Sequence, residues 1–135
     1  MFLNLPHFIS QHVTGRTEHF FQPDLEQFNA ELSARIDERS VLVIGGAGTI
    51  GASFVKAILK YRPARLFVVD TNENGLTELV RDLRSSLGYN IPPVFLTYPI
   101  DFGDTVFEKI LRREGPFEIV ANFAAHKHVR SEKDH

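Results

Sequence analysis

An unbroken apolar stretch that leads directly into closely spaced glycines constrains the fold of this chain more than any other feature. Val41–Ile44 has the composition of a strand that is buried on both faces of a sheet. Four glycines stand within the next seven residues: Gly45, Gly46, Gly48 and Gly51. A buried strand, a glycine-rich turn and a following helix form the context that a phosphate-binding loop requires.

The residues after this turn have the spacing of an amphipathic helix. We expect a helix over residues 52–59, with an apolar face made by Ile50, Phe54, Ala57 and Ile58. The N–H groups of its first turn and the positive end of its dipole would bind an anion. A simpler interpretation is that the glycines serve only a turn that needs positive φ.

The spacing Gly45-x-x-Gly48-x-x-Gly51 assigns each glycine a predicted role. Gly45 is expected to make the tight turn, and Gly48 has no side chain that would obstruct a pyrophosphate. Gly51 allows the helix to pack closely on the strand. We therefore expect a loop that binds the phosphates of a dinucleotide.

A second apolar run, Arg65–Asp70, ends in a carboxylate 19 residues after Gly51. Dinucleotide-binding folds place at this position the acidic residue that binds the hydroxyls of the adenosine ribose. A carboxylate there also repels a 2′-phosphate, and residues 71–74 include no Lys or Arg that would neutralise one. The pattern thus favours NAD over NADP. Alternatively, or in addition, Asp70 is a cap or turn residue of the next helix.

Strand-like and helix-like patterns alternate through the rest of the chain. Further helices are expected over residues 74–87 and 104–113, and further strands over residues 94–98 and 117–123. This alternation predicts an α/β fold with a parallel sheet, namely a partial doubly wound sheet of the Rossmann type with about four strands.

The segment before the first strand has a different pattern. Residues 24–38 are predicted to form a helix, with Asp24 as its N-cap and Gln27 completing a capping box. Its apolar stripe would contain Leu25, Phe28, Leu32 and Ile36. We expect residues 1–39 to be a helical N-terminal extension that makes a dimer contact, and residues 40–135 to be the N-terminal half of an NAD(P)-binding Rossmann domain.

Composition excludes several classes of function. The net charge of −2 does not favour nucleic acid as a partner, and the absence of cysteine excludes disulfides and thiolate metal sites. No apolar run approaches the ~20 residues of a membrane span, and the start lacks a secretory pattern, so we expect a cytoplasmic protein. His7, His12 and His19 have no acidic neighbour at ligand spacing, and no metal site is expected.

Five segments together resemble one family: GGAGTIG, VVDTNENGL, RDLRSS, PIDFGD and NFAAHKHVRSEKD. The set is similar to extended short-chain dehydrogenases/reductases of the UDP-N-acetylglucosamine 4,6-dehydratase type, which serve polysaccharide biosynthesis. The resemblance covers residues 41–134. It implies a lyase that binds a nicotinamide cofactor and a nucleotide-sugar substrate, and whether that cofactor is NAD or NADP is left open by the family itself.

The resemblance also implies roles for particular residues. In the glycine loop, Thr49 and Ile50 would supply backbone N–H groups to the pyrophosphate, beside the three glycines. Asp101 and Phe102 would form the adenine pocket. For Asp101, a second interpretation stays open, in which it only caps the next helix.

The last matched segment is assigned to the other side of the cofactor. Asn122, Ala124 and Ala125 resemble the segment beside the ribose and pyrophosphate, where small residues allow a close approach. Lys127 and His128 would border the nucleotide-sugar cleft and contact a phosphate or hydroxyl. An equally good interpretation makes them part of a solvated basic loop.

The catalytic Tyr-x-x-x-Lys of the family has no counterpart in this chain. Its tyrosines, Tyr61, Tyr89 and Tyr98, are followed four positions later by Arg65, Pro93 and Phe102. We therefore expect no catalytic residue here, and an NAD-binding portion that is inactive alone. The alternatives are an epimerase or reductase of the same superfamily, and a non-catalytic nucleotide-binding module. An uncovered sheet edge predicts a homo-oligomer.

Overall fold

The computed structural model of the chain describes residue 8, residues 10–15 and residues 20–125. Residues up to 32 and residues from 33 onward form two compact units. The first unit contains a π-helical turn, η1 (Ser10–Thr14), and helix α2 (Gln22–Gln27), whereas α3 (Asn29–Ile36) includes the boundary between the units. The expected domain boundary between residues 39 and 40 stays a prediction.

The single helix predicted over residues 24–38 is wrong, because the chain forms α2 and α3 with an interruption at Phe28. Helix α2 already begins at Gln22 and its N-cap is Phe21, so Asp24 lies within the first turn and is not the cap. In the first turn, the negative charge of Asp24 interacts favourably with the positive end of the helix dipole. Phe28 is 47% exposed and does not continue a buried stripe.

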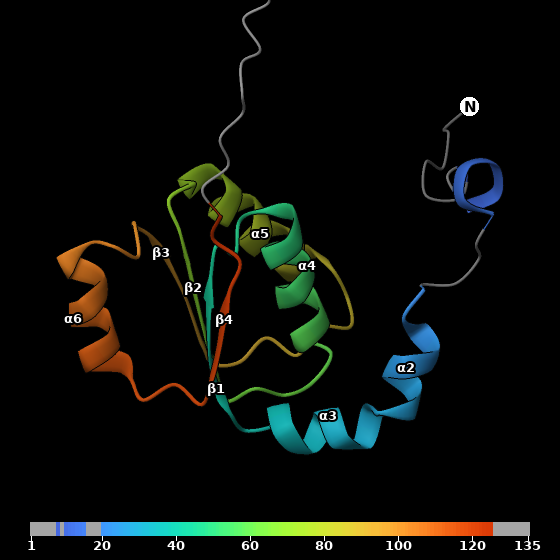
Figure 1. Cartoon of the computed structure of the whole chain (residues 1–135), viewed down its shortest axis with the longest axis horizontal. Helices are drawn as coiled ribbons and strands as arrows, with labels where there is room; N and C mark the ends of the chain where they lie inside the picture. The colour runs from blue at the N-terminus through green and yellow to red at the C-terminus, as the bar shows by residue number, and fades with distance from the viewer. Residues whose placement is uncertain (1–7, 9, 16–19, 126–135) are drawn as a thin grey trace, which may run out of the picture. The chain divides into compact units, whose positions relative to one another are not determined.

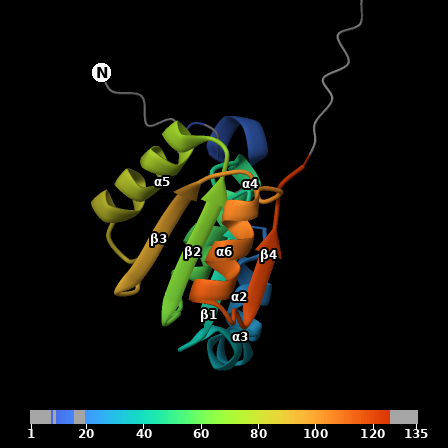
Figure 2. The ribbon, with the colours of Figure 1, turned by 90° about the vertical axis from the view of Figure 1, so that its left-hand side faces the viewer.

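Four parallel strands make one sheet, and they lie in the order β3-β2-β1-β4 (Figures 1 and 2). The strands are β1 (Ser40–Ile44), β2 (Arg65–Asp70), β3 (Val94–Pro99) and β4 (Ile119–Asn122). After β3 the chain returns across the sheet and adds β4 on the far side of β1. In open sheets of this kind, ligands bind outside the carboxyl ends of the strands, where the strand order reverses.

Helices cover both faces of this sheet, which confirms the partial doubly wound fold. Helices α4 (Thr49–Ile58) and α5 (Glu73–Ser85) lie on one face, and α6 (Thr105–Glu114) lies on the other (Figure 1). All five residues of β1 and the four inner residues of β2 are buried. Such burial on both faces explains why these strands are continuous hydrophobic runs.

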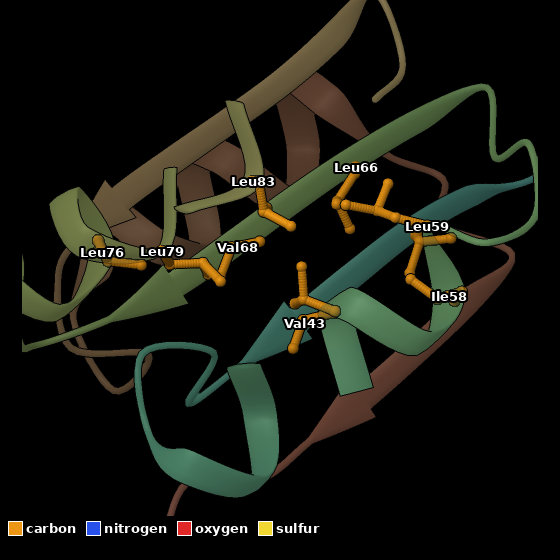
Figure 3. Close-up of a cluster of buried hydrophobic side chains, with 10 residues drawn as sticks. Val43, Ile58, Leu59, Leu66, Val68, Leu76, Leu79 and Leu83 are labelled. Atoms are coloured by element: carbon orange, nitrogen blue, oxygen red, sulfur yellow. The ribbon is translucent and has the colours of Figure 1, made fainter. Parts of the chain in front are cut away.

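Alternate residues of β1 and β2 enter two separate cores. Val43, Leu66 and Val68 pack with residues of α4 and α5 in the larger core (Figure 3). Leu42 and Phe67 point to the opposite face, where they pack with Phe107 of α6.

The predicted apolar face of α4 is only partly right, since Ile58 is buried and Phe54 packs against the larger core, but Ile50 and Ala57 do not. The buried positions are Gly51, Val55 and Ile58, whereas Ile50 is 67% exposed. Ala57, which was also predicted to face inward, is exposed. The helix begins at residue 49, three residues earlier than expected, and the close approach of Gly51 to the glycine loop sets which side faces the sheet.

Helix α5 buries Leu76, Leu79 and Leu83, which recur at helical spacing. Its N-cap is Asn72, whose side-chain oxygen accepts the N–H of Gly75. It ends at Ser85, two residues before the predicted end.

The face of the sheet on which α6 lies is less fully covered than the face on which α4 and α5 lie. Val106 and Leu111 of α6 are 43% and 36% exposed, and Val120 on the edge strand β4 is 58% exposed. These surfaces are compatible with self-association, and the homo-oligomer stays a prediction. No helix in the described part of the chain is long and apolar enough to cross a membrane.

Glu118 joins the beginnings of β1 and β4. Its carboxylate accepts the backbone N–H of Ser40 at 3.0 Å and a guanidinium N–H of Arg39 at 2.7 Å. The Ser40 bond, followed by the Arg39 bond, lowers the pKa of this carboxyl. The ionised form is therefore stabilised by folding.

We expect Glu118→Gln to lower the melting temperature at pH 7. Because the folded-state pKa is lowered, the contribution of Glu118 is present above its unfolded-state pKa and is lost as the pH falls through the folded-state value. The melting curves of the variant and the unmutated chain should converge in acid. Glu108→Gln, which removes only an exposed pair with Arg112 within α6, is the control and should change the melting temperature less. A Glu118→Gln difference that is independent of pH contradicts this account.

Candidate functional site

A cavity of about 470 Å³ opens beyond the carboxyl ends of the strands. Its lining includes seven of the residues predicted to bind a cofactor, namely Gly45, Gly48, Asp70, Asp101, Phe102, Ala124 and Ala125. These residues come from four separate segments of the chain. The topology thus brings together the glycine loop and the residues that follow β2, β3 and β4.

The remaining predicted residues are placed differently. Thr49, Ile50 and Gly51 form the first turn of α4, and Asn122 ends β4, but none of the four lines the cavity. Lys127 and His128 lie outside the described residues. The lining also includes residues that the sequence analysis did not select: Ile44, Val69, Thr71, Ile100 and Phe123.

Gly45 and Gly51 are required by close approaches of the backbone. Gly45 has φ +76°, and a Cβ on it would lie 2.5 Å from the amide nitrogen of Ala124. A Cβ on Gly51 would collide with the carbonyl oxygen of Gly45. The loop, the start of α4 and the segment after β4 therefore fit together only without these side chains.

Gly48 has a different environment. Its φ is −72°, and the nearest atom to a Cβ there would be the Gly45 carbonyl oxygen at 3.6 Å, so the position itself tolerates a side chain. It is the N-cap of α4, and no side chain caps that helix. The N–H groups of the first turn, which include those of Thr49 and Ile50, have no acceptor within the helix. Gly48 thus leaves open the approach to an uncapped helix end.

Asp70 accepts two backbone hydrogen bonds through its two carboxylate oxygens. Oδ2 accepts the N–H of Ala47 at 2.9 Å, and Oδ1 accepts the N–H of Asn72 at 2.9 Å. The N-cap of α5 is Asn72, so Asp70 is a turn residue and not the cap. Each oxygen retains a second lone pair, so these bonds are compatible with accepting ribose hydroxyls.

The interpretation of Asp101 as a helix cap is wrong. Its Oδ1 accepts the N–H of Gly103 at 2.8 Å, whereas α6 is capped by Asp104, which accepts the N–H of Val106. Asp101 instead shapes the turn after β3. Phe102, which is 46% exposed, follows it on the cavity wall.

Asn122 supports the cavity without lining it. Its Oδ1 accepts the N–H of Ala124 at 2.9 Å and so holds the backbone that Gly45 contacts. Phe123 between them packs against Phe54 of α4, with ring centroids 5.1 Å apart. Phe123 could have been identified as a lining residue by its position directly after a strand, because the residues that follow parallel strands share one edge of the sheet.

The charged side chains among the described lining residues are two carboxylates, those of Asp70 and Asp101. An anionic ligand would therefore be held by backbone N–H groups and the helix dipole. In the described part of the chain, no group of three or more His, Cys, Asp or Glu residues could hold a metal ion.

This strand order, with a cavity outside the point where the order reverses, is that of a Rossmann-like doubly wound α/β fold. A short-chain type dehydrogenase/reductase from Mycobacterium ulcerans is 20% identical, with a TM-score of 0.55 over 69% of this chain and 34% of that one. At this identity the likeness concerns the fold.

The sequence pattern of the polysaccharide biosynthesis protein family matches residues 41–134, and the chain belongs to that family. The probable polysaccharide biosynthesis protein EpsC of Bacillus subtilis (strain 168) is 31% identical over 100 residues, which are 74% of this chain. The capsular polysaccharide biosynthesis protein CapD of Staphylococcus aureus is 24% identical over 100 residues, also 74% of this chain. The matched region is 16% of the length of each of these relatives.

We expect Gly45→Ala to destabilise the chain more than Gly88→Ala. Both glycines have positive φ, at +76° and +96°, so both variants carry the left-handed backbone cost of about 1–2 kcal/mol. Only the new methyl group at position 45 meets backbone, since nothing lies within 4 Å of a Cβ on Gly88. The additional cost should be about 1–3 kcal/mol. Urea unfolding measures the loss of unfolding free energy in each variant. Equal losses in the two variants contradict the close contact between Gly45 and Ala124.

Proposed function

We propose that this chain is the NAD-binding part of a nucleotide-sugar dehydratase of the UDP-N-acetylglucosamine 4,6-dehydratase type. The observation that carries the proposal is the convergence of the glycine loop, Asp70 and the Asp101–Phe102 turn on one cavity at the carboxyl edge of the sheet. Membership in a polysaccharide biosynthesis family supports an activated sugar as the substrate.

The residues present fit a dinucleotide. The open position at Gly48 and the uncapped start of α4 would hold the pyrophosphate, through the N–H groups of residues such as Thr49 and Ile50. Asp70 would bind the adenosine ribose, and Phe102 would pack on the adenine beside Asp101. Gly51 would act indirectly, by permitting the approach of α4 to the loop.

The small residues after β4 would border the rest of the cofactor. Ala124 and Ala125 line the cavity, and Asn122 fixes the backbone between them and the strand. When bound, the nicotinamide supplies hydride transfer, while the protein supplies position and acid/base groups. This chain would bind and orient the cofactor. Lys127 and His128 stay candidates for the border of the sugar cleft.

Because the relatives are much longer, the proposed activity concerns a protein of their length that contains residues 1–135. Such a protein should convert UDP-N-acetylglucosamine to a 4-keto-6-deoxy sugar nucleotide, seen by mass spectrometry as the loss of one water. Residues 1–135 alone should form none. If residues 1–135 alone form this product, the inference that the acid/base groups lie outside this chain is wrong. If the longer protein forms no product, the proposed dehydratase activity is wrong.

We also propose that the protein is a cytoplasmic homo-oligomer.

Electrostatics support NAD over NADP as the cofactor. A 2′-phosphate near Asp70 would bring like charges together, at a cost on the order of 4 kcal/mol per unit charge at ~4 Å and an effective dielectric near 20. The described lining has no Lys or Arg that would offset this repulsion.

The unmutated chain should therefore bind NAD at least tenfold more tightly than NADP, as measured by calorimetric titration. Asp70→Asn keeps the side-chain shape but removes the charge, so it should narrow the ratio of NAD to NADP affinity by removing the repulsion of the 2′-phosphate. Asp82→Asn, on α5 and paired with Lys56 of α4, is the control and should leave the ratio of NAD to NADP affinity unchanged. Equal or tighter binding of NADP to the unmutated chain would show that Asp70 does not face the ribose.

A further inference from the structure

The glycine loop is attached to the end of β2 by three consecutive N–H groups. The N–H groups of Gly45 and Gly46 donate to the carbonyl oxygen of Val69, at 2.7 and 3.4 Å. The N–H of Ala47 donates to Asp70 Oδ2 at 2.9 Å. Only this third bond has a side chain as its acceptor, so it is the one that depends on the identity of residue 70.

The carboxylate is itself held in place from the other side. Its second oxygen accepts the N–H of Asn72, and Asn72 in turn caps α5 by accepting the N–H of Gly75. A Cβ on Gly75 would lie 2.9 Å from the Cβ of Ala47. Ala47 is thus confined between the Asp70 carboxylate and the first turn of α5.

Ala47 directly precedes Gly48, the N-cap of α4. A carboxylate that fixes the Ala47 amide therefore also fixes the path of the chain into the helix end that would receive the pyrophosphate. We propose that Asp70 is a positioning residue for the phosphate-binding loop, in addition to its role as an acceptor for the ribose. This inference rests on the proposed function of the cavity.

The two roles of Asp70 make different predictions for its substitution. If Asp70 only contacts the ribose, its loss matters only for ligands that carry ribose hydroxyls. If it also positions the loop, its loss lowers the population of the binding-competent loop, and the affinity for every pyrophosphate ligand falls in proportion. Asp70→Arg then weakens both NAD and NADP and does not convert the chain to an NADP-binding protein.

The test compares ADP with 2′,3′-dideoxy-ADP, which lacks both hydroxyls, by titration into the chain and its variants. Asp70→Ala should weaken dideoxy-ADP about three- to tenfold, and ADP by more. Asp37→Ala is the matched control, since Asp37 also accepts a backbone N–H, that of Arg62 at 2.9 Å, but at the amino ends of the strands. It should leave both affinities unchanged. Dideoxy-ADP binding that is unaffected by Asp70→Ala overturns the proposal.

A second measurement needs no ligand and no variant. In the NMR spectrum of the unmutated chain, the amide nitrogen of Ala47 should show a scalar coupling through the hydrogen bond to the carboxyl carbon of Asp70. Absence of this coupling overturns the proposal, even if Asp70→Ala does not fold. If the chain binds neither nucleotide, the proposed function fails, and this coupling alone then decides whether Asp70 holds the loop.

Discussion

The contact between Gly51 and the main chain of Gly45 is the constraint on which the rest of the site depends. No side chain fits at position 51, because it would overlap the carbonyl oxygen of residue 45. This contact brings α4 against the end of β1 and turns Val55 and Ile58 toward the sheet. It also directs the start of α4 toward the cavity. The packing of α4 on the sheet and the position of the proposed anion site therefore both depend on the contact between Gly51 and Gly45.

Much of this architecture could be predicted from the sequence, because its strongest signals are local. The hydrophobic runs of β1 and β2 have their predicted positions, and the three leucines buried on α5, Leu76, Leu79 and Leu83, recur at helical spacing. The face of α4 could be assigned only in part. Ile50 and Phe54 follow one helical spacing, yet Phe54 packs against the larger core while Ile50 is exposed in the first turn of the helix.

The site shows the same division between local and non-local information. Asp70 could be identified by its distance from the glycines, but the Ala47 bond that it accepts could not, because nothing in the sequence specifies which amide faces a carboxylate. Asp101 and Asp104 are both plausible caps by residue type. The helix begins at residue 105, and that position alone assigns the cap to Asp104. Thr71 and Ile100 were overlooked because they carry no charge or glycine signal.

The attachment of β4 has a consequence for the order of folding. Strands β1, β2 and β3 pair with neighbours that are close along the chain, whereas the bond between Ser40 and Glu118 joins residues 78 positions apart. The entropy of closing so long a loop must be lost before this pairing contributes any stability. We therefore expect β4 to dock late, after the first three strands are assembled. The cavity, whose wall includes Phe123, Ala124 and Ala125, is then complete only in the last stage of folding.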